Sequence, residues 1–362
     1  MSGSEAIVDT HAQAAAQPLP PLLIREPLAA YLDARGLGEA GAPIEARPIG
    51  EGHSNVTYLI RRGARELVLR RPPRPPLPPS AHDVLREARL LTALERTPAR
   101  TPTVLAACDD ERVIGAPFYV MEKVEGEVLL SELPPALDPP EQRRRIGEQL
   151  VDALAEVHAV DWRAAGLEDY GRPTGYLERQ LRRFSGLWEH NRTRELPTLD
   201  RVSAWLAANR PESGPATIVH GDYRLGNTMF APREPAELVA IFDWELATIG
   251  DPLADVGYLA ATWAQPGDEE AGTVFALGAV TMQPGFPTRE ELIARYEEVS
   301  GRSMRDVRWY ATLALWKAAI FLEGSYRRLL AGTTDDPFFA LLDRGVPTLA
   351  ERAWNVANGS DH

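Results

Sequence analysis

One short segment, residues 218–230, constrains the fold of this chain more than any other. It reads Ile-Val-His-Gly-Asp-Tyr-Arg-Leu-Gly-Asn-Thr-Met-Phe, and it places Asp222 and Asn227 five positions apart in a loop. The next apolar run, Leu238–Phe242, ends on Asp243. Phosphoryl transfer from a Mg-nucleotide needs one carboxylate to orient the attacking hydroxyl, and an amide and a second carboxylate to hold the metal. Asp222 and Asn227 alone could form an ordinary Asx-rich turn, but Asp243 after a second strand favours phosphoryl-transfer chemistry.

The composition predicts a folded protein of one large or two medium domains. The chain has 362 residues, of which 44% are apolar and 25% are charged, an ordinary balance for a globular protein. No apolar run approaches the roughly 18–20 residues needed to span a bilayer, and the N-terminal residues lack the pattern of a secretory signal. We therefore expect no membrane partner. The single cysteine, Cys108, excludes an internal disulfide framework, which favours a cytoplasmic location.

The charge is unevenly distributed along the chain. The net charge of −13 argues against a nucleic-acid partner. Residues 44–123 contain 13 basic and 10 acidic side chains, a net of +3, so the remainder carries −16. A mildly basic N-terminal part suits an anionic ligand. Lys123 and Lys317 are the only lysines, so 37 of the 39 basic residues are arginine.

The hydrophobic pattern predicts strands first and helices later. We expect a flexible N-terminal tail over 1–24, a nucleotide-binding lobe over 25–123 and a helical lobe over 124–362. Within the first lobe, the pattern predicts helices at 25–35 and 83–94, and strands at 46–49, 56–60, 66–70 and 118–124. In the second lobe it predicts helices at 141–160 and 309–330, and apolar strands at 217–219 and 238–242 that end on polar loops.

A glycine-rich turn, Gly50-Glu-Gly-His-Ser-Asn55, lies between two of the predicted strands. Glycines there let the backbone approach a phosphate closely and expose N–H groups to it. The same turn could be an ordinary hairpin connection. It is not a P-loop, because the chain has no Gly-Lys-Ser/Thr tripeptide.

Together these segments resemble the aminoglycoside phosphotransferase-like family, small-molecule kinases that share the two-lobed fold of protein kinases. The resemblance is carried by His-Gly-Asp-x-x-x-x-Asn at 220–227 and by Asp-Trp-Glu…Gly-Asp-Pro…Asp at 243–255, and it extends from about Ile44 to Arg328. It implies an α+β, bilobal protein-kinase-like fold, with a small antiparallel sheet in the N-lobe and a large, mostly helical C-lobe. Gly221 before Asp222, where protein kinases have arginine, favours this family over protein kinases.

The resemblance also implies a role for individual residues. Asp222 would be the catalytic aspartate, and Arg224 would neutralise the transferred phosphoryl group. Asn227 and Asp243 would bind Mg²⁺ at the floor of a cleft between the lobes. The residues implied to contact ATP are Gly50, Gly52 and Ser54 over the phosphates, and the backbones of Glu122 and Val124 at the adenine.

One departure from the family pattern concerns the lysine that kinases carry on the third strand. No lysine precedes Lys123, so Arg70 is expected in that role, paired with Glu87 on the following helix. Arg71 is the alternative, but strand alternation places Arg70 on the face of Val68. Arginine and lysine are not interchangeable, so nucleotide binding could differ from that of the family.

Several other polar residues have both a structural and a functional interpretation. His220 and Asp255 are expected to brace the loop, and His158 is expected in the core. His53 is either an exposed loop residue or a phosphate contact. The candidates for lining an acceptor site, each of which could instead be a core residue or solvated, are Trp263, Trp309, Tyr310, Trp316, Lys317 and Arg327.

The acceptor is not fixed by these motifs. Leu69-Arg-Arg-Pro-Pro73 and Ala314-Leu-Trp-Lys-Ala318 resemble the branch related to phosphotransferase domains fused to acyl-CoA dehydrogenases, which implies hydroxyacyl-CoA phosphorylation. We therefore expect an ATP- and Mg²⁺-dependent kinase of a small-molecule hydroxyl. An antibiotic kinase and a nucleotide-binding pseudokinase are the alternatives, and the oligomeric state is unknown.

Overall fold

The chain divides into two compact units. The computed structural model describes residues 6–50, 55–76, 82–268, 279–334 and 337–360. Unit 1 comprises residues 1–97 and 101–125, and unit 2 comprises residues 98–100 and 126–362. The division falls close to the boundary predicted between 123 and 124. Among the described residues, no helix combines the length and the apolar content needed to cross a membrane.

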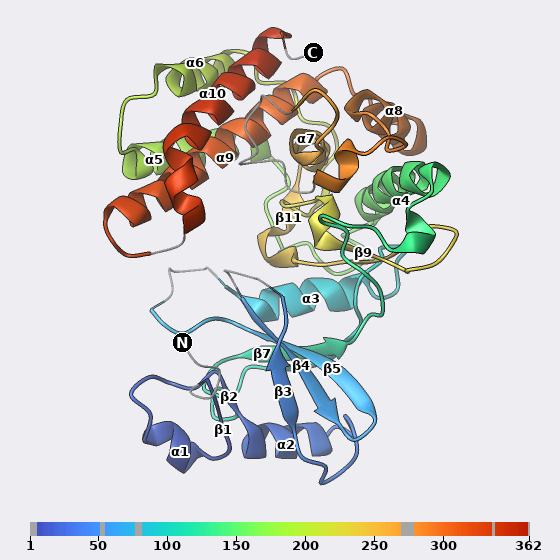
Figure 1. Ribbon diagram of the computed structural model, residues 1–362, viewed down its shortest axis with the longest axis vertical. Coiled ribbons are helices and arrows are strands. Elements are labelled where there is room, and N and C mark those ends of the chain that lie inside the picture. The colour runs from blue at the N-terminus through green and yellow to red at the C-terminus, as the bar shows by residue number, and fades with distance from the viewer. Residues whose placement is uncertain (1–5, 51–54, 77–81, 269–278, 335–336, 361–362) are drawn as a thin grey trace. The chain divides into compact units, whose positions relative to one another are not determined.

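Unit 1 contains a five-stranded antiparallel sheet (Figure 1). Its strand order is β3-β4-β5-β7-β6. The strands are β3 (Glu45–Pro48), β4 (Val56–Arg62), β5 (Arg65–Arg71), β6 (Val104–Cys108) and β7 (Phe118–Glu122). The strands predicted at 46–49, 56–60, 66–70 and 118–124 are therefore present, whereas β6 was not predicted because its Leu-Ala-Ala centre lacks the β-branched residues typical of strands.

Two helices cover opposite faces of this sheet (Figure 1). Leu28 and Leu32 of α2 (Arg25–Asp33) pack in one core cluster with Leu69 and Val120. The alternate residues of the strands, such as Val68, point to the other face, where α3 (Val84–Leu94) contacts β6 and β7. Burying each such leucine contributes roughly 1.5–3 kcal/mol, so both faces hold the sheet in place.

The residues expected to form a flexible tail are ordered from residue 6 onward. β1 (Ile7–Val8) pairs in parallel with β2 (Leu23–Ile24), and the helix α1 (His11–Ala15) lies between them. Leu23 is fully buried, and the Arg71 guanidinium donates a hydrogen bond to the carbonyl oxygen of Leu22 at 2.6 Å. The prediction of a flexible tail over 1–24 is wrong for these residues, because apolar side chains among the polar ones bind the segment to unit 1.

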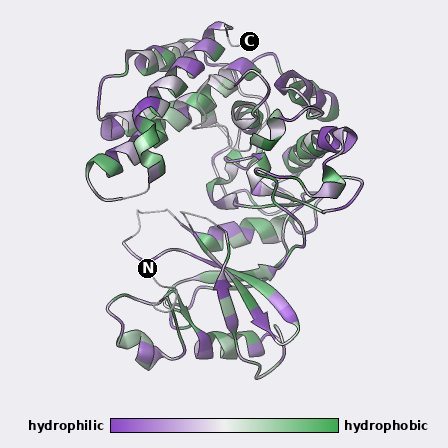
Figure 2. Ribbon diagram, in the orientation of Figure 1, coloured by the Kyte–Doolittle hydropathy of each residue, from purple (hydrophilic) through white to green (hydrophobic). Residues whose placement is uncertain are grey.

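Unit 2 is mainly helical and is built around one long helix. α9 (Val307–Leu330) is buried mainly between Trp309 and Ile320. The helices that pack against it are α5 (Tyr176–Asn191), α6 (Pro197–Ala208), α7 (Leu253–Thr262) and α10 (Leu342–Asn358) (Figure 1). α4 (Pro140–Ala159) instead buries one face through Ile146, Leu150 and Leu154, and Figure 2 shows both hydrophobic and hydrophilic residues along it. α8 (Arg289–Ser300) packs against α4.

Two short strand pairs in unit 2 position the loops singled out by the sequence. β8 (Thr217–Val219) pairs antiparallel with β11 (Thr248–Gly250), and β9 (Thr228–Phe230) pairs antiparallel with β10 (Leu238–Ile241). The segment 220–227 therefore joins the two pairs, and Asp243 follows directly after β10.

Candidate active site

Asp255, in the first turn of α7, anchors the start of the loop from His220 to Asn227. The Asp255 carboxylate accepts hydrogen bonds from the backbone N–H groups of His220, at 2.7 Å, and Gly221, at 2.8 Å. Asp255 is fully buried. Because buried N–H groups without partners are costly, this one carboxylate fixes the start of the loop, as the sequence led us to expect.

His158 supports that carboxylate from α4. Its Nε2 lies 3.2 Å from Asp255 Oδ2, and its Nδ1 lies 2.6 Å from the Tyr296 hydroxyl oxygen. Burial lowers the pKa of His158 below its ordinary value, although the neighbouring Asp255 opposes this shift. Burial would raise the pKa of Asp255, but the His158 hydrogen bond and the charges around it keep this pKa lowered. At neutral pH the pair is therefore a carboxylate braced by a neutral imidazole.

This arrangement predicts a pH dependence of stability. Since the folded-state pKa of His158 is depressed, the unfolded chain takes up a proton first as the pH falls below about 6.5. The contribution of His158 is thus fully present above that pH and is lost below it. We expect His158→Gln to have a flatter dependence of the unfolding temperature on pH between 8 and 5 than the wild-type protein. Parallel curves from thermal unfolding would contradict this expectation.

The His220 ring ties the loop to the segment that carries Asp243. Its Nε2 donates to the carbonyl oxygen of Phe242 at 2.8 Å, and its Nδ1 accepts from the backbone N–H of Asp222 at 3.2 Å. The ring is fully buried and lies 4.6 Å from the Trp244 ring, centroid to centroid. With both ring nitrogens engaged by the backbone, His220 has a structural position.

Asp222 and Asn227 are in direct contact. The Asn227 Nδ2 donates to the Asp222 carboxylate and to the Asp222 carbonyl oxygen, both at 2.8 Å. Arg224 Nε lies 3.7 Å from Asp222 Oδ1. The side chains of Asp222 and Arg224 are 20% and 22% exposed, so both can reach a ligand while their neighbours hold them in place.

Asn227 and Asp243 are brought together by the β9–β10 pair. The backbone N–H of Phe242 donates to the carbonyl oxygen of Asn227 at 2.8 Å, which puts the residue before Asp243 against Asn227. Asp243 has φ 65° and ψ 57°, the left-handed conformation that aspartate tolerates better than most residues. The side-chain nitrogen of Asn227 donates to Asp222, and no described residue donates to its side-chain oxygen. That oxygen can therefore bind a cation. A carboxylate and an amide oxygen are a donor set that fits Mg²⁺.

Tyr258 is a site residue that the sequence analysis missed. Burial and the adjacent Asp222 carboxylate, to which the phenol donates a hydrogen bond, raise the pKa of Tyr258 well above its ordinary value. The residue lies on α7, three positions after Asp255. Residues three apart share a helix face, so the position of Asp255 below the loop could have indicated that Tyr258 faces the loop too.

In unit 1, Arg70 forms the ion pair expected from the sequence. Arg70 Nε lies 3.0 Å from Glu87 Oε2, and the two side chains are 14% and 2% exposed. Arg71 is buried instead on the other face, where it donates to the carbonyl oxygens of Leu22, Pro72 and Ile114. The alternation of β5 therefore separates the two arginines as predicted, and Arg70 is the one that pairs with α3.

The other residues implied to contact ATP are placed only in part. Gly50 has φ +77°, and no atom of the described residues lies within 4 Å of the position that a Cβ would take there. Gly52, His53 and Ser54 lie outside the described residues. The backbone N–H of Glu122 donates to the carbonyl oxygen of Thr103 at 2.9 Å. The N–H of Glu122 is therefore engaged within unit 1, and Val124, two positions on, is half-buried.

The aromatic candidates for an acceptor site are core residues. Each of the four is at most 3% exposed, and they are Trp263, Trp309, Tyr310 and Trp316. The indole of Trp309, for example, donates to the carbonyl oxygen of Leu206 at 3.0 Å. Arg327 donates to the carbonyl oxygen of His190. Of that set, Lys317 is the partly buried residue without such a partner among the described residues.

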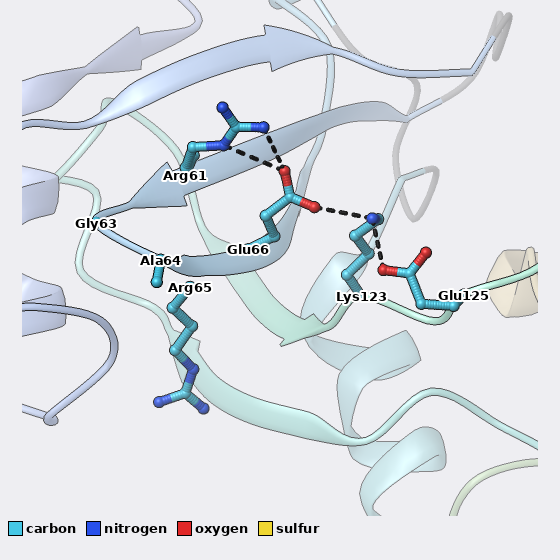
Figure 3. A pocket seen from close by; sticks show the side chains of 7 residues that line it. All are labelled: Arg61, Gly63, Ala64, Arg65, Glu66, Lys123 and Glu125. Carbon is cyan, nitrogen blue, oxygen red and sulfur yellow. Dashed lines mark hydrogen bonds and ion pairs between the residues drawn. The ribbon is translucent and has the colours of Figure 1, made fainter.

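Unit 1 also has a polar surface pocket, shown in Figure 3. Arg61, Glu66, Lys123 and Glu125 form a chain of ion pairs across it (Figure 3). Hydrogen bonds from Lys123 and Arg61 lower the pKa of Glu66 to about 2. Lys123 thus forms ion pairs with two carboxylates, Glu66 and Glu125.

Comparison with known proteins identifies the family. Residues 45–292 match the profile of the phosphotransferase enzyme family. The chain belongs to this family. The match includes the segments that hold Arg70, Asp222, Asn227 and Asp243, so the predicted family resemblance is confirmed.

The curated relatives of this phosphotransferase are longer proteins. Mouse acyl-CoA dehydrogenase family member 10 is 35% identical over 317 residues, which cover 87% of this chain and 29% of the relative. Human acyl-CoA dehydrogenase family member 11 is 33% identical over 330 residues, which cover 90% of this chain and 42% of the relative. The chain therefore spans less than half the length of these relatives.

Solved structures confirm the bilobal, kinase-like α+β fold of this phosphotransferase. A provisionally assigned aminoglycoside phosphotransferase from Ralstonia eutropha is 32% identical, with a TM-score of 0.77 over 93% of this chain and 99% of that one. The aminoglycoside phosphotransferase APH(4)-Ia, solved with AMP-PNP and hygromycin B, has a TM-score of 0.57 over 93% of this chain and 99% of its own. At 15% identity, that second likeness shows the fold alone.

Proposed function

We propose that this phosphotransferase is an ATP-dependent kinase that transfers the γ-phosphate to a hydroxyl group of a small molecule. The observation that carries the proposal is the contact of Asn227 with Asp222, beside the segment that leads to Asp243. A catalytic carboxylate must be held within a fraction of an ångström of its productive position. The two hydrogen bonds from the Asn227 amide to Asp222 support such positioning.

In the proposed reaction Asp222 accepts the proton of the acceptor hydroxyl as its oxygen attacks the γ-phosphorus. The bond between that phosphorus and the β–γ bridging oxygen breaks, and ADP leaves with the electron pair. Arg224, which lies 3.7 Å from Asp222, offsets charge on the transferred phosphoryl group. Mg²⁺ bound to Asn227 and Asp243 would supply positive charge for the phosphate oxygens.

Unit 1 would contribute the nucleotide contacts. Glu87 would orient the Arg70 guanidinium toward the α- and β-phosphates. Over the phosphates we propose Gly50, Gly52 and Ser54, and at the adenine we propose the backbones of Glu122 and Val124. We propose residues 25–123 as the nucleotide-binding lobe and 124–362 as the acceptor lobe. A cytoplasmic location is proposed as well, supported by the single cysteine.

The Arg70 assignment predicts a specific kinetic effect. A hydrogen bond to a charged group contributes about 1.5–3 kcal/mol, so Arg70→Ala should raise the KM for ATP about 10- to 100-fold. Arg70→Lys should restore part of this loss, and Arg65→Ala, on the exposed end of the same strand, should change nothing. Steady-state kinetics with varied ATP measure the effect. An unchanged KM for Arg70→Ala would remove Arg70 from the nucleotide site.

For the acceptor we propose a hydroxyacyl-CoA or a related hydroxy acid. The names of the curated relatives, which are acyl-CoA dehydrogenase family members, support an acyl acceptor. An antibiotic acceptor is the second candidate, because the Ralstonia relative is provisionally assigned to aminoglycosides.

A panel of acceptors tests the function. It contains hydroxyacyl-CoAs, free hydroxy acids, aminoglycosides and sugars, and it is scored for ADP release and for the mass of the phosphorylated product. Phosphorylation of one class identifies the acceptor. If the protein binds Mg-ATP but phosphorylates no member of a wide panel, the pseudokinase alternative is favoured.

A further inference from the structure

Lys317 is a half-buried amine that has no counter-ion among the residues that the structure describes. Across the described residues it makes no hydrogen bond and no ion pair, and the contact it does make is with the Phe184 ring, whose centroid lies 4.8 Å from Nζ. Lys123, the other lysine, contacts two carboxylates. Removing a cation from water without giving it a partner costs free energy, so the position of Lys317 requires an explanation.

A second cation lies beside Lys317. The Arg183 guanidinium carbon is 5.8 Å from the centroid of the same Phe184 ring, and Arg183 also lacks an ion pair within the part of the chain that the structure describes. α5 carries Arg183 and Phe184, and it packs against α9, which carries Lys317 (Figure 1). Both cations thus lie within 5.8 Å of the centroid of one aromatic ring, and the exposed Arg183 charge acts on Lys317. Two like charges near one another favour an anion that contacts both.

Two carboxylates of the candidate site, Asp222 and Asp255, act electrostatically on Lys317. Burial and then the Arg183 charge lower the pKa of Lys317 to about 8, whereas Asp255 and Asp222 act to raise it. Lys317 thus lies within range of the carboxylate that would take the proton from the acceptor. It is held too far from that carboxylate to form an ion pair with it, and it remains available to a bound molecule.

An exposed apolar side chain continues the same face of α9. Phe321 is 62% exposed, and it lies four positions after Lys317, a spacing that places both on one side of the helix. Phe321 thus places an apolar side chain one helical turn from the half-buried Lys317, where the hydrocarbon part of an amphipathic molecule would find a partner.

We infer that Lys317 and Arg183 bind an anionic group of the acceptor, while its hydrocarbon part lies toward Phe321. The acceptor class is then an anionic, chain-bearing hydroxy compound, rather than a polycation. This inference rests on the proposed kinase function and names the substrate class of that same site. The anion could be the carboxylate of a free hydroxy acid or a phosphate of a CoA thioester, and the experiment separates these sources.

The first test is kinetic. Lys317→Gln should raise the KM for the anionic acceptor about 10- to 100-fold, leave the KM for ATP unchanged and alter kcat little, and Lys317→Arg should restore the KM. If the KM rises only for the free hydroxy acid, Lys317 binds its carboxylate. If the KM rises only for the thioester, Lys317 binds a phosphate of CoA. Arg182→Gln, on the exposed side of the same helix, is the matched control. An unchanged acceptor KM, or an equal loss with a neutral alcohol, overturns the inference.

The second test does not depend on turnover. An amine-reactive acylating reagent is applied to the full chain, and the modification of Lys317 and Lys123 is followed by mass spectrometry of their peptides. A free hydroxy acid or its CoA thioester should slow the modification of Lys317 several-fold and not that of Lys123, whereas an aminoglycoside should protect neither. Protection without turnover would support the anion site and contradict the proposed kinase function. Turnover without protection of Lys317 would support the kinase function and contradict the anion site.

Discussion

Asp222→Ala should abolish phosphoryl transfer and leave the binding of nucleotide close to that of the wild-type protein. A positioned general base contributes roughly 10²–10⁴-fold to a rate, so kcat should fall at least by that factor. Nucleotide affinity should persist, because the residues proposed to hold ATP do not include Asp222. ADP release with the best acceptor measures the first quantity, and titration with a non-hydrolysable ATP analogue measures the second.

Two further variants separate chemistry from structure in this experiment. Asp222→Asn keeps an oxygen that can accept from Asn227 Nδ2, so it should preserve the loop and still lose activity. Glu237→Gln removes an exposed carboxylate of unit 2 that pairs only with Arg233 in the described residues, and it should leave kcat unchanged. Turnover retained by Asp222→Ala would exclude the proposed mechanism.

The elements of the fold could be predicted where the local pattern is decisive. Alternation identified β4 and β5, and it correctly separated Arg70 from Arg71. The segment 6–24 was misjudged because its order depends on Leu23 reaching a core built by residues far along the chain, and a composition rich in alanine and proline does not show this.

The candidate site could be predicted as a set of residues, but not as a geometry. The motif named Asp222, Asn227 and Asp243, since their chemistry is local to two short loops. It could not show that Tyr258 contacts Asp222, because that contact depends on how α7 packs beneath the loop. The aromatic residues of α9 were ambiguous for a related reason. A helix that is apolar on all sides does not indicate which side faces a ligand, and only the packing shows that Trp309, Tyr310 and Trp316 are in the core.

Asp255→Ala should cause the largest loss of stability of any single change near the site. The substitution leaves the N–H groups of His220 and Gly221 without acceptors and removes the partner of His158. Breaking a buried, hydrogen-bonded charge typically costs about 3–5 kcal/mol. The free energy of unfolding of unit 2 should fall by about this amount, and kcat should fall too, because Asp222 follows directly after the released backbone.

Denaturant unfolding and amide exchange test this expectation together. Asp255→Asn keeps one acceptor oxygen, so it should lose less stability than the alanine variant, and it provides a folded protein if the latter does not fold. Exchange of the His220 and Gly221 amides should speed up in both variants. Glu178→Ala, which removes an exposed pair with Arg182, should leave unfolding and exchange unchanged, since exposed ion pairs contribute little. Unfolding of Asp255→Ala at the same denaturant concentration as Glu178→Ala would contradict this expectation. The His220 ring would then hold the loop instead, through its bonds to Phe242 and Asp222. In that case the segment of Asp243, rather than α7, would position the catalytic carboxylate.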